Sequence, residues 1–168
     1  MHVLITGGTG FIGKALVPAL LEQGTTVTVL SRVPRESSAD LRYVTDLSQV
    51  KASVDAVINL AGASLADKRW SEAYKAEIVA SRVQLTQGLV DWMATLITPP
   101  KVLLSGSAIG YYGHSDDAEF SEQSPAGAGF SADLCQQWES AALRAESLGT
   151  RVVLLRLGVV FDRDGGAL

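Results

Sequence analysis

Apolar runs alternate with amphipathic stretches along the whole chain, and each kind of stretch predicts one kind of element. The runs expected to form strands are His2–Thr6, Thr26–Leu30, Leu41–Val44, Val54–Leu60, Lys101–Ser105 and Arg151–Leu157. Apolar positions at helical spacing predict helices over Phe11–Gln23, Ser71 to about Thr95, and Ser131–Leu148. Because strands that alternate with helices pair in parallel, the pattern predicts an α/β fold with helices on both faces of one sheet.

The ends of the expected helices carry recognisable signals. Gly24 and Gly149 follow two of them, as glycine does at helix C-termini. Ser71 precedes the long helix as an N-cap, and Pro99-Pro100 ends it. The stretch over residues 113–129 is long and irregular, and we expect it to border a site, because long loops at the carboxyl ends of strands usually carry function.

Three glycines stand where the first expected strand turns into the first helix: Gly7, Gly10 and Gly13, at Gly-x-x-Gly-x-x-Gly spacing. Backbone N–H groups and the helix dipole favour a pyrophosphate at such a helix start. A Cβ at Gly7 or Gly10 would obstruct the turn or the phosphate, and one at Gly13 would push the helix off the sheet. The alternative is a glycine-rich turn without a ligand. In this context the triplet predicts a dinucleotide site in a Rossmann-type, doubly wound parallel sheet.

The residues after the second strand indicate which dinucleotide is bound. An NAD-binding fold usually has Asp or Glu there, whereas this chain has Ser31 and Arg32. A guanidinium pairs with a phosphate through two hydrogen bonds, so this pair favours NADP(H). Arg32 could instead be a solvated loop residue, with Arg35 as its competitor. Asp46, after the third strand, is predicted either to contact the adenine or to cap the next helix.

Composition excludes several classes of protein. The chain has 168 residues, about one domain, and a single cysteine, Cys135, so it forms no internal disulfide. No signal peptide is evident, and the apolar runs are too short to span a bilayer, so we expect a cytoplasmic protein without a membrane partner. With 14 basic and 18 acidic residues and no basic cluster, no nucleic-acid partner is expected.

Several motifs together resemble the extended short-chain dehydrogenase/reductase superfamily. These are Thr6–Gly13, Asn59–Gly62 and Ser105–Gly113, in that order along the chain. More narrowly, the chain is similar to an atypical branch of that superfamily, the epimerase family of sugar-nucleotide-epimerase-like proteins. The narrower resemblance depends on Ala66–Trp70, Ser81-Arg82, the Gly-Tyr-Tyr-Gly run and Leu134–Glu139.

The resemblance implies a set of NADP(H)-binding residues. Gly7, Gly10, Phe11, Ile12 and Gly13 would hold the pyrophosphate, and Ser31 and Arg32 the 2′-phosphate. Leu60, Ala61 and Gly62 would line the adenosine and ribose side, and Arg82 would reach the cofactor from the long helix. From the residues alone, Arg82 could instead be a surface residue paired with Glu77 or Asp91.

The chain departs from the superfamily at its catalytic pair. Short-chain reductases usually carry Tyr-x-x-x-Lys on one helix, where the lysine lets the phenol act as an acid or base near neutral pH. No tyrosine of this chain has a lysine four positions later. If Glu139 matches the acidic residue that often follows that motif, the two positions are Ser131 and Cys135, which cannot do this work. We expect Cys135 to be a small buried helix residue.

Other residues are left as candidates for the chemistry. Ser107 occupies the position of the superfamily's substrate-polarising Ser or Thr, with Ser105 as a rival. Tyr111 and Tyr112 follow, and Tyr112 is our candidate for a substitute acid. The tryptophans Trp70 and Trp138 are expected to pack.

Two functions follow from these candidates. The first is an NADP(H)-dependent oxidoreductase or epimerase acting on an unidentified small carbonyl or hydroxyl compound, perhaps nucleotide-linked. The alternative is a non-catalytic nucleotide-binding or regulatory protein, which the missing Tyr-x-x-x-Lys pair suggests. Relatives have at times been labelled cell-division inhibitors, a label that fits this class. We expect residues 1–168 to be an NAD(P)-binding domain, with the family's C-terminal substrate lobe largely absent. Relatives commonly form homodimers through the two long helices, and the sequence leaves this open.

Overall fold

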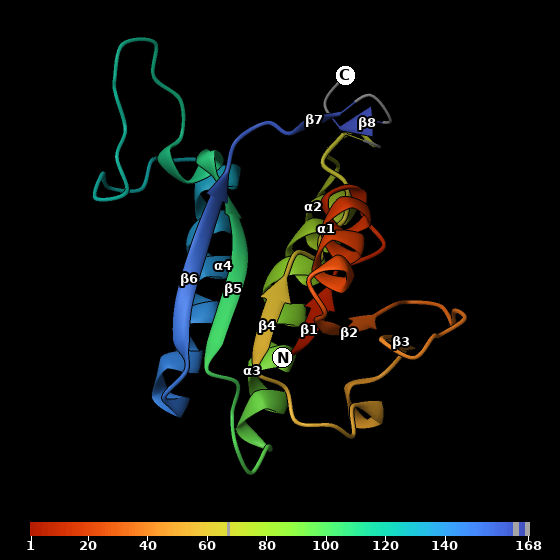
Figure 1. Ribbon diagram of the computed structural model, residues 1–168. Coiled ribbons are helices and arrows are strands. Elements are labelled where there is room, and N and C mark those ends of the chain that lie inside the picture. Colours follow the sequence, from red (N-terminus) through yellow and green to blue (C-terminus); the bar gives the residue numbers. More distant parts are fainter. Residues whose placement is uncertain (67, 163–164, 167–168) are drawn as a thin grey trace.

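The computed structural model describes residues 1–66, 68–162 and 165–166, and its centre is a six-stranded, all-parallel sheet (Figure 1). Its strands are β1 (His2–Thr6), β2 (Thr26–Leu30), β3 (Leu41–Val44), β4 (Ala56–Asn59), β5 (Val102–Ala108) and β6 (Arg151–Leu157). The strand order is β3-β2-β1-β4-β5-β6, so the winding direction reverses between β1 and β4. Ligands of doubly wound sheets bind outside the carboxyl ends of the strands at this reversal. The predicted Rossmann-type sheet is confirmed.

Helices cover both faces of the sheet, as predicted. Helix α1 (Phe11–Glu22) packs through Val17 on Val3 and Ile5 of β1. The opposite face of β1 presents Leu4 to a cluster that includes residues of α3 (Leu85–Ala94) and α4 (Phe130–Leu143). Alternate side chains of a strand point to opposite faces, so a strand covered on both sides is apolar throughout.

The long helix expected from Ser71 to Thr95 is present but is not uniformly α-helical. Ser71 caps α2 (Glu72–Val79) by accepting a hydrogen bond from the Tyr74 N–H, as predicted. A π-helical segment, η2 (Ala80–Gln84), then joins α2 to α3. The last helix also changes form, because α4 ends at Leu143 and continues as the 3₁₀ segment η4 (Arg144–Leu148).

The segment after β5 leads to the long loop. A 3₁₀ turn, η3 (Ile109–Tyr112), follows β5, and residues 113–129 then form the irregular loop that was predicted (Figure 1, teal). The loop returns to η3, where the Gly127 N–H donates to the Tyr111 carbonyl at 2.9 Å. A short hairpin of β7 (Phe161–Asp162) and β8 (Gly165–Gly166) follows β6. Within the described residues, no helix has the length and apolar character needed to cross a bilayer.

Candidate cofactor and catalytic site

The glycine turn connects β1 to α1 and has no room for side chains at two positions. Gly7 has a φ of +73°, and a Cβ there would lie 2.6 Å from the Leu60 carbonyl carbon. A Cβ at Gly13 would lie 2.4 Å from the Gly7 carbonyl oxygen, whereas one at Gly10 would lie 3.1 Å from it. Gly13 was expected to allow close packing on the sheet, but what it allows is close approach to the backbone of the turn itself. Glycine is therefore required at positions 7 and 13.

The start of α1 offers unused hydrogen-bond donors. Gly10 is its N-cap, no side chain of the described residues caps it, and its first turn carries no acidic residue. The first helical bond runs from the Lys14 N–H to the Gly10 carbonyl at 2.9 Å. The N–H groups of Phe11, Ile12 and Gly13 thus precede the helical ladder, and such groups attract anions. The turn therefore fits the pyrophosphate that the sequence predicted.

Ser31 and Arg32, which follow β2, differ in their exposure to solvent. Ser31 is buried, and its hydroxyl donates to the Val33 carbonyl at 2.8 Å, whereas Arg32 is exposed. The guanidinium of Arg35 lies 6.0 Å from the centre of the Tyr43 ring. Both arginines are exposed, and Arg32 is the one that directly follows Ser31.

Asp46 is an N-cap, which was one of its two predicted roles. Its carboxylate accepts from the Ser48 N–H at 2.8 Å, at the start of the 3₁₀ turn η1 (Leu47–Gln49). The Gln49 side chain accepts in return from the Asp46 N–H at 3.3 Å. The hydrogen bonds from Ser48 lower the pKa of Asp46.

A buried hydrogen-bond network joins β1, β4 and β5 at the reversal of strand order. The Asn59 amide donates to the hydroxyls of Thr86, at 2.8 Å, and Ser105, at 3.1 Å. The Thr6 hydroxyl donates to the Asn59 side-chain oxygen at 2.6 Å and accepts from the Ala61 N–H at 3.2 Å. The network holds the backbone that leads into Leu60–Gly62. It also holds the buried Ser105 hydroxyl, which accepts from Asn59.

Arg82 is part of the π-helical segment and is half-buried. Its Nη2 donates to the Ala63 carbonyl at 3.0 Å, and its guanidinium lies 5.4 Å from the centre of the Trp138 ring. The surface pairing considered for Arg82 does not occur. Glu77 pairs with Lys68 at 3.5 Å, and Asp91 pairs with Arg144 at 2.6 Å.

Ser107 and Tyr112 are joined through two residues that were not among the candidates. The buried Ser107 hydroxyl donates to Glu139 Oε1 at 2.6 Å. Arg156 of β6 donates to both carboxylate oxygens of Glu139, at 2.8 and 2.9 Å, and its Nη1 donates to the Tyr112 hydroxyl at 2.9 Å. The hydrogen bonds to Glu139 raise the pKa of Arg156, so the guanidinium is always charged.

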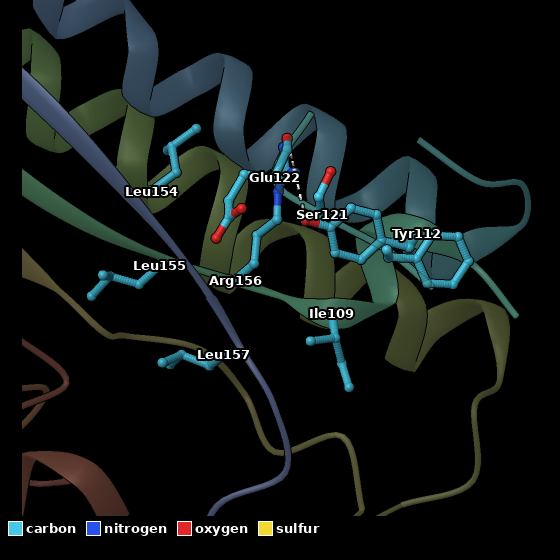
Figure 2. A pocket seen from close by; sticks show the side chains of 9 residues that line it. Ile109, Tyr112, Ser121, Glu122, Leu154, Leu155, Arg156 and Leu157 are labelled. Carbon is cyan, nitrogen blue, oxygen red and sulfur yellow. Dashed lines mark hydrogen bonds between the residues drawn. The ribbon is translucent and has the colours of Figure 1, made fainter. Parts of the chain in front are cut away.

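Arg156 also packs on aromatic rings. It lies 3.5 Å from the centre of the Tyr111 ring and 5.1 Å from that of Tyr112, which stacks on Phe120 of the long loop. A pocket of about 620 Å³ borders Tyr112 and Arg156 along β6, not the glycine turn. Figure 2 shows Arg156 reaching from β6 toward Tyr112 and Glu122, whereas Leu155 and Leu157 point to the other side of the strand. Tyr112 is therefore accessible from a mostly apolar pocket.

The positions of the missing Tyr-x-x-x-Lys pair face the end of β5. A Cβ at Gly110 would lie 3.2 Å from the Cβ of Ser131. Cys135 is a small buried helix residue, as expected; its thiol donates to the Ala108 carbonyl at 3.7 Å, and burial raises its pKa. The described part of the chain contains no group of three His, Cys, Asp or Glu residues suited to a metal.

Trp70 and Trp138 pack, as expected. Trp138 is buried, and its indole N–H donates to the Thr86 hydroxyl at 3.0 Å. A Cβ added at Gly106 would lie only 3.0 Å from the Trp138 ring. Trp70 is half-exposed, donates to the Leu65 carbonyl at 2.8 Å and packs edge-on against Phe130 with ring centres 5.4 Å apart.

Two relatives match nearly the whole chain. It is 41% identical over 173 residues to the epimerase family protein SSP1921 of Staphylococcus saprophyticus, covering 99% of this chain and 58% of that protein. It is 39% identical over 182 residues to the chloroplastic SDR39U1 homolog of Arabidopsis thaliana, covering 100% of this chain and 51% of that protein. The chain thus spans between half and three-fifths of the length of these relatives.

Solved structures agree with the sequence relatives. The human epimerase family protein SDR39U1, crystallised with NADPH, is 38% identical, with a TM-score of 0.89 over 99% of this chain and 57% of that one. A nucleoside-diphosphate sugar epimerase from Corynebacterium glutamicum is 33% identical, with a TM-score of 0.82 over 100% of this chain and 36% of that one. The model of the NAD dependent epimerase/dehydratase family matches residues 3–163. With this fold, this glycine turn and these relatives, the chain belongs to the NAD dependent epimerase/dehydratase family.

Proposed function

We propose that this chain binds NADP(H) and acts as the cofactor-binding part of an oxidoreductase or epimerase for a small carbonyl or hydroxyl compound. The observation that carries the proposal is the glycine turn, where Gly7 and Gly13 leave no room for a Cβ and three N–H groups at the start of α1 precede the helical hydrogen bonds. The human relative crystallised with NADPH supports the same cofactor. Family membership favours this function over the regulatory alternative.

The order of the strands supports an assignment of the cofactor's parts along the sheet. Arg32 follows β2, the glycine turn follows β1, and Leu60–Gly62 follow β4, and these three strands are neighbours. We then assign the 2′-phosphate to Arg32, the pyrophosphate to the start of α1 and the nicotinamide half to the side of β5, with Leu60–Gly62 lining the adenosine and ribose side as the resemblance implies. Because the Ser31 hydroxyl is used by the Val33 carbonyl, Ser31 orients this turn, and Arg32 supplies the charge.

Ser107 and Tyr112 are the proposed catalytic residues. The cofactor, when bound, supplies or accepts a hydride. The Tyr112 oxygen accepts from Arg156, which leaves the phenol proton free for a substrate carbonyl oxygen. The Ser107 hydroxyl donates its one hydrogen bond to Glu139, so its oxygen lone pairs are free to accept a hydrogen bond from a substrate hydroxyl. In this arrangement Ser107 orients the substrate and Tyr112 donates the proton.

Tyr112→Phe separates chemistry from binding, because it keeps the ring and removes the proton. In a protein of the relatives' full length we expect it to stop NADPH oxidation by an accepted carbonyl compound, while calorimetry gives an unchanged NADPH affinity. Retained turnover would exclude Tyr112 as the proton donor.

We also propose where the substrate lobe lies and how the chain forms a dimer. We assign residues 1–168 the cofactor-binding role. We place the substrate lobe in the part of the relatives that this chain does not match; for SSP1921 the match covers 58% of that protein, which leaves about 42%.

Helices α3 and α4 lie side by side and are proposed to form a homodimer interface. Sedimentation velocity distinguishes this dimer from a monomer.

Arg32→Gln tests the 2′-phosphate site. A guanidinium–phosphate contact is worth about 1.5–3 kcal/mol, so we expect calorimetry to show NADPH affinity falling by roughly 10- to 150-fold. NADH affinity stays unchanged, because NADH has no 2′-phosphate. The matched control is Arg35→Gln, which removes the neighbouring arginine, and it should leave both affinities alone. Loss in Arg35→Gln instead would transfer the role to Arg35.

A further inference from the structure

The guanidinium of Arg156 divides its hydrogen bonds between an anion and a phenol. Its Nε and Nη2 donate to the two carboxylate oxygens of Glu139, at 2.8 and 2.9 Å. Its Nη1 carries two further hydrogens and donates to the Tyr112 hydroxyl at 2.9 Å and to the Glu122 carbonyl at 3.1 Å. A guanidinium serves several acceptors at once because its donors form a planar fork, whereas a lysine ammonium is a single point. Arg156 therefore reaches the phenol while it stays paired with its anion.

The neighbours of Arg156 leave its guanidinium little freedom to move. Its central carbon lies 3.5 Å from the centre of the Tyr111 ring, which is a stacking distance, and the arginine side chain is 18% exposed. The hydrogen bonds to Glu139 raise the pKa of Arg156, so its positive charge is permanent. A charge that is fixed in place and withdrawn from water acts more strongly on a neighbouring atom than a charge in solvent. The Tyr112 oxygen is such a neighbouring atom.

Arg156 meets α4 next to the position matched to the lysine of the missing catalytic pair. That position is Cys135, and Glu139 follows it by one helical turn. Glu139 also accepts from the Ser107 hydroxyl at 2.6 Å. In Tyr-x-x-x-Lys reductases the phenol and the cation come from one helix, whereas here Tyr112 comes from η3 and Arg156 from β6. A phenol and a cation thus meet beside Ser107, although they come from different elements.

Tyr112 is open to a substrate from the pocket along β6. Tyr112 and Arg156 border this pocket of about 620 Å³, and most of its other lining residues are apolar (Figure 2). Phe120 stacks on the Tyr112 ring, with ring centres 5.1 Å apart and an angle of 11° between the rings. The ring is thus held by Phe120 and its oxygen by Arg156, so a carbonyl compound in the pocket meets a phenol of fixed orientation.

We propose that Arg156 is a positioning residue in the role of the missing lysine: it holds the Tyr112 hydroxyl and stabilises the phenolate that forms when Tyr112 donates its proton. The proposal rests on the proposed oxidoreductase function. In a reduction, the hydride that NADPH supplies joins the carbonyl carbon and NADP⁺ remains. The O–H bond of Tyr112 breaks, and its proton joins the carbonyl oxygen to give the alcohol. A proton from water then restores the phenol. Because the negative charge forms on the atom that accepts from Arg156, this contact strengthens during the reaction.

Arg156→Lys tests the proposal, because an ammonium keeps a positive charge beside Glu139 but does not reproduce the fork that also reaches Tyr112. The measurement is NADPH oxidation by para-nitrobenzaldehyde, an apolar carbonyl probe, in a protein of the relatives' full length. We expect kcat to fall at least about tenfold and the KM for NADPH to change by less than about twofold. The solvent isotope effect on kcat, measured in heavy water, should rise, because proton transfer becomes the slow step. The matched control Arg151→Lys replaces an exposed arginine of the same strand and should change none of these quantities.

The outcomes separate this proposal from the one on which it rests. An unchanged kcat in Arg156→Lys would overturn it. A lower kcat with an unchanged isotope effect would also overturn it, because Arg156 would then only support the fold. Calorimetric binding of NADPH shows that the variant is folded, and loss of that binding would equally reduce Arg156 to a structural role. If the unmodified protein bound NADPH but did not reduce the aldehyde, the reductase chemistry proposed for this site would fail instead.

Discussion

Glu139 and Arg156 form a bidentate ion pair whose side chains are only 7% and 18% exposed. Two charges withdrawn from water are costly unless they are paired and their remaining hydrogen-bonding groups are used. Here Ser107 donates to the carboxylate, and the guanidinium also donates to Tyr112 and to the Glu122 carbonyl. The ion pair therefore holds both proposed catalytic side chains in place.

Removing the carboxylate should destabilise the protein. Glu139→Ala leaves Arg156 without its anion and the Ser107 hydroxyl without its acceptor, so we expect the free energy of unfolding to fall by about 3 kcal/mol. Urea denaturation measures it. The control Asp91→Ala breaks the exposed pair with Arg144, whose side chains are 62% and 51% exposed, and should cost less than about 1 kcal/mol. Equal losses in the two variants would contradict the role given to the buried pair.

At this scale the sequence identified Ser107 and Tyr112 as candidates but did not predict how they are connected. Arg156 interrupts an apolar strand, and this is a signal that a buried charge needs a partner. The partner could not be identified, because Glu139 is 17 positions away on another element. In the same way, the Asn59 network depends on hydrogen bonds between distant positions, which hydrophobic periodicity does not report.

Elements were predicted more completely than contacts. The limits of β6 are as predicted, whereas β4 is shorter and β5 longer than expected, because pairing with neighbours decides strand ends. The π-helical segment was missed, although its signal is present. The buried Ile78 and Val83 are five positions apart, and a π turn absorbs the extra residue so that both face the core.

Two glycines of the helices should respond oppositely to the same substitution. Gly24 follows α1 with a φ of +72°, so Gly24→Ala should cost about 1 kcal/mol. Gly88 lies exposed within α3, where an added Cβ meets nothing within 4 Å, so Gly88→Ala should stabilise by roughly 0.5–1 kcal/mol. Thermal unfolding of both variants checks the pair, and destabilisation by Gly88→Ala would contradict the assignment of α3.

For the whole molecule, the alternation of strands and helices was sufficient to predict the fold class. The strand order β3-β2-β1-β4-β5-β6 was not predicted beyond the doubly wound class, and it is the basis for the direction proposed for the cofactor. The sequence did not predict the neighbours of Arg82. Its contacts with Ala63 and Trp138 require α4, the π-helical segment and the loop after β4 to be packed together.

The most direct test of the central claim is a calorimetric titration of the chain with NADPH and, separately, with NADH. We predict that NADPH binds at least about tenfold more tightly, because Arg32 adds a charge-assisted contact to the 2′-phosphate. Equal affinities, or tighter binding of NADH, would contradict the assignment of the site after β2. Binding of neither cofactor would contradict the proposed function of the glycine turn.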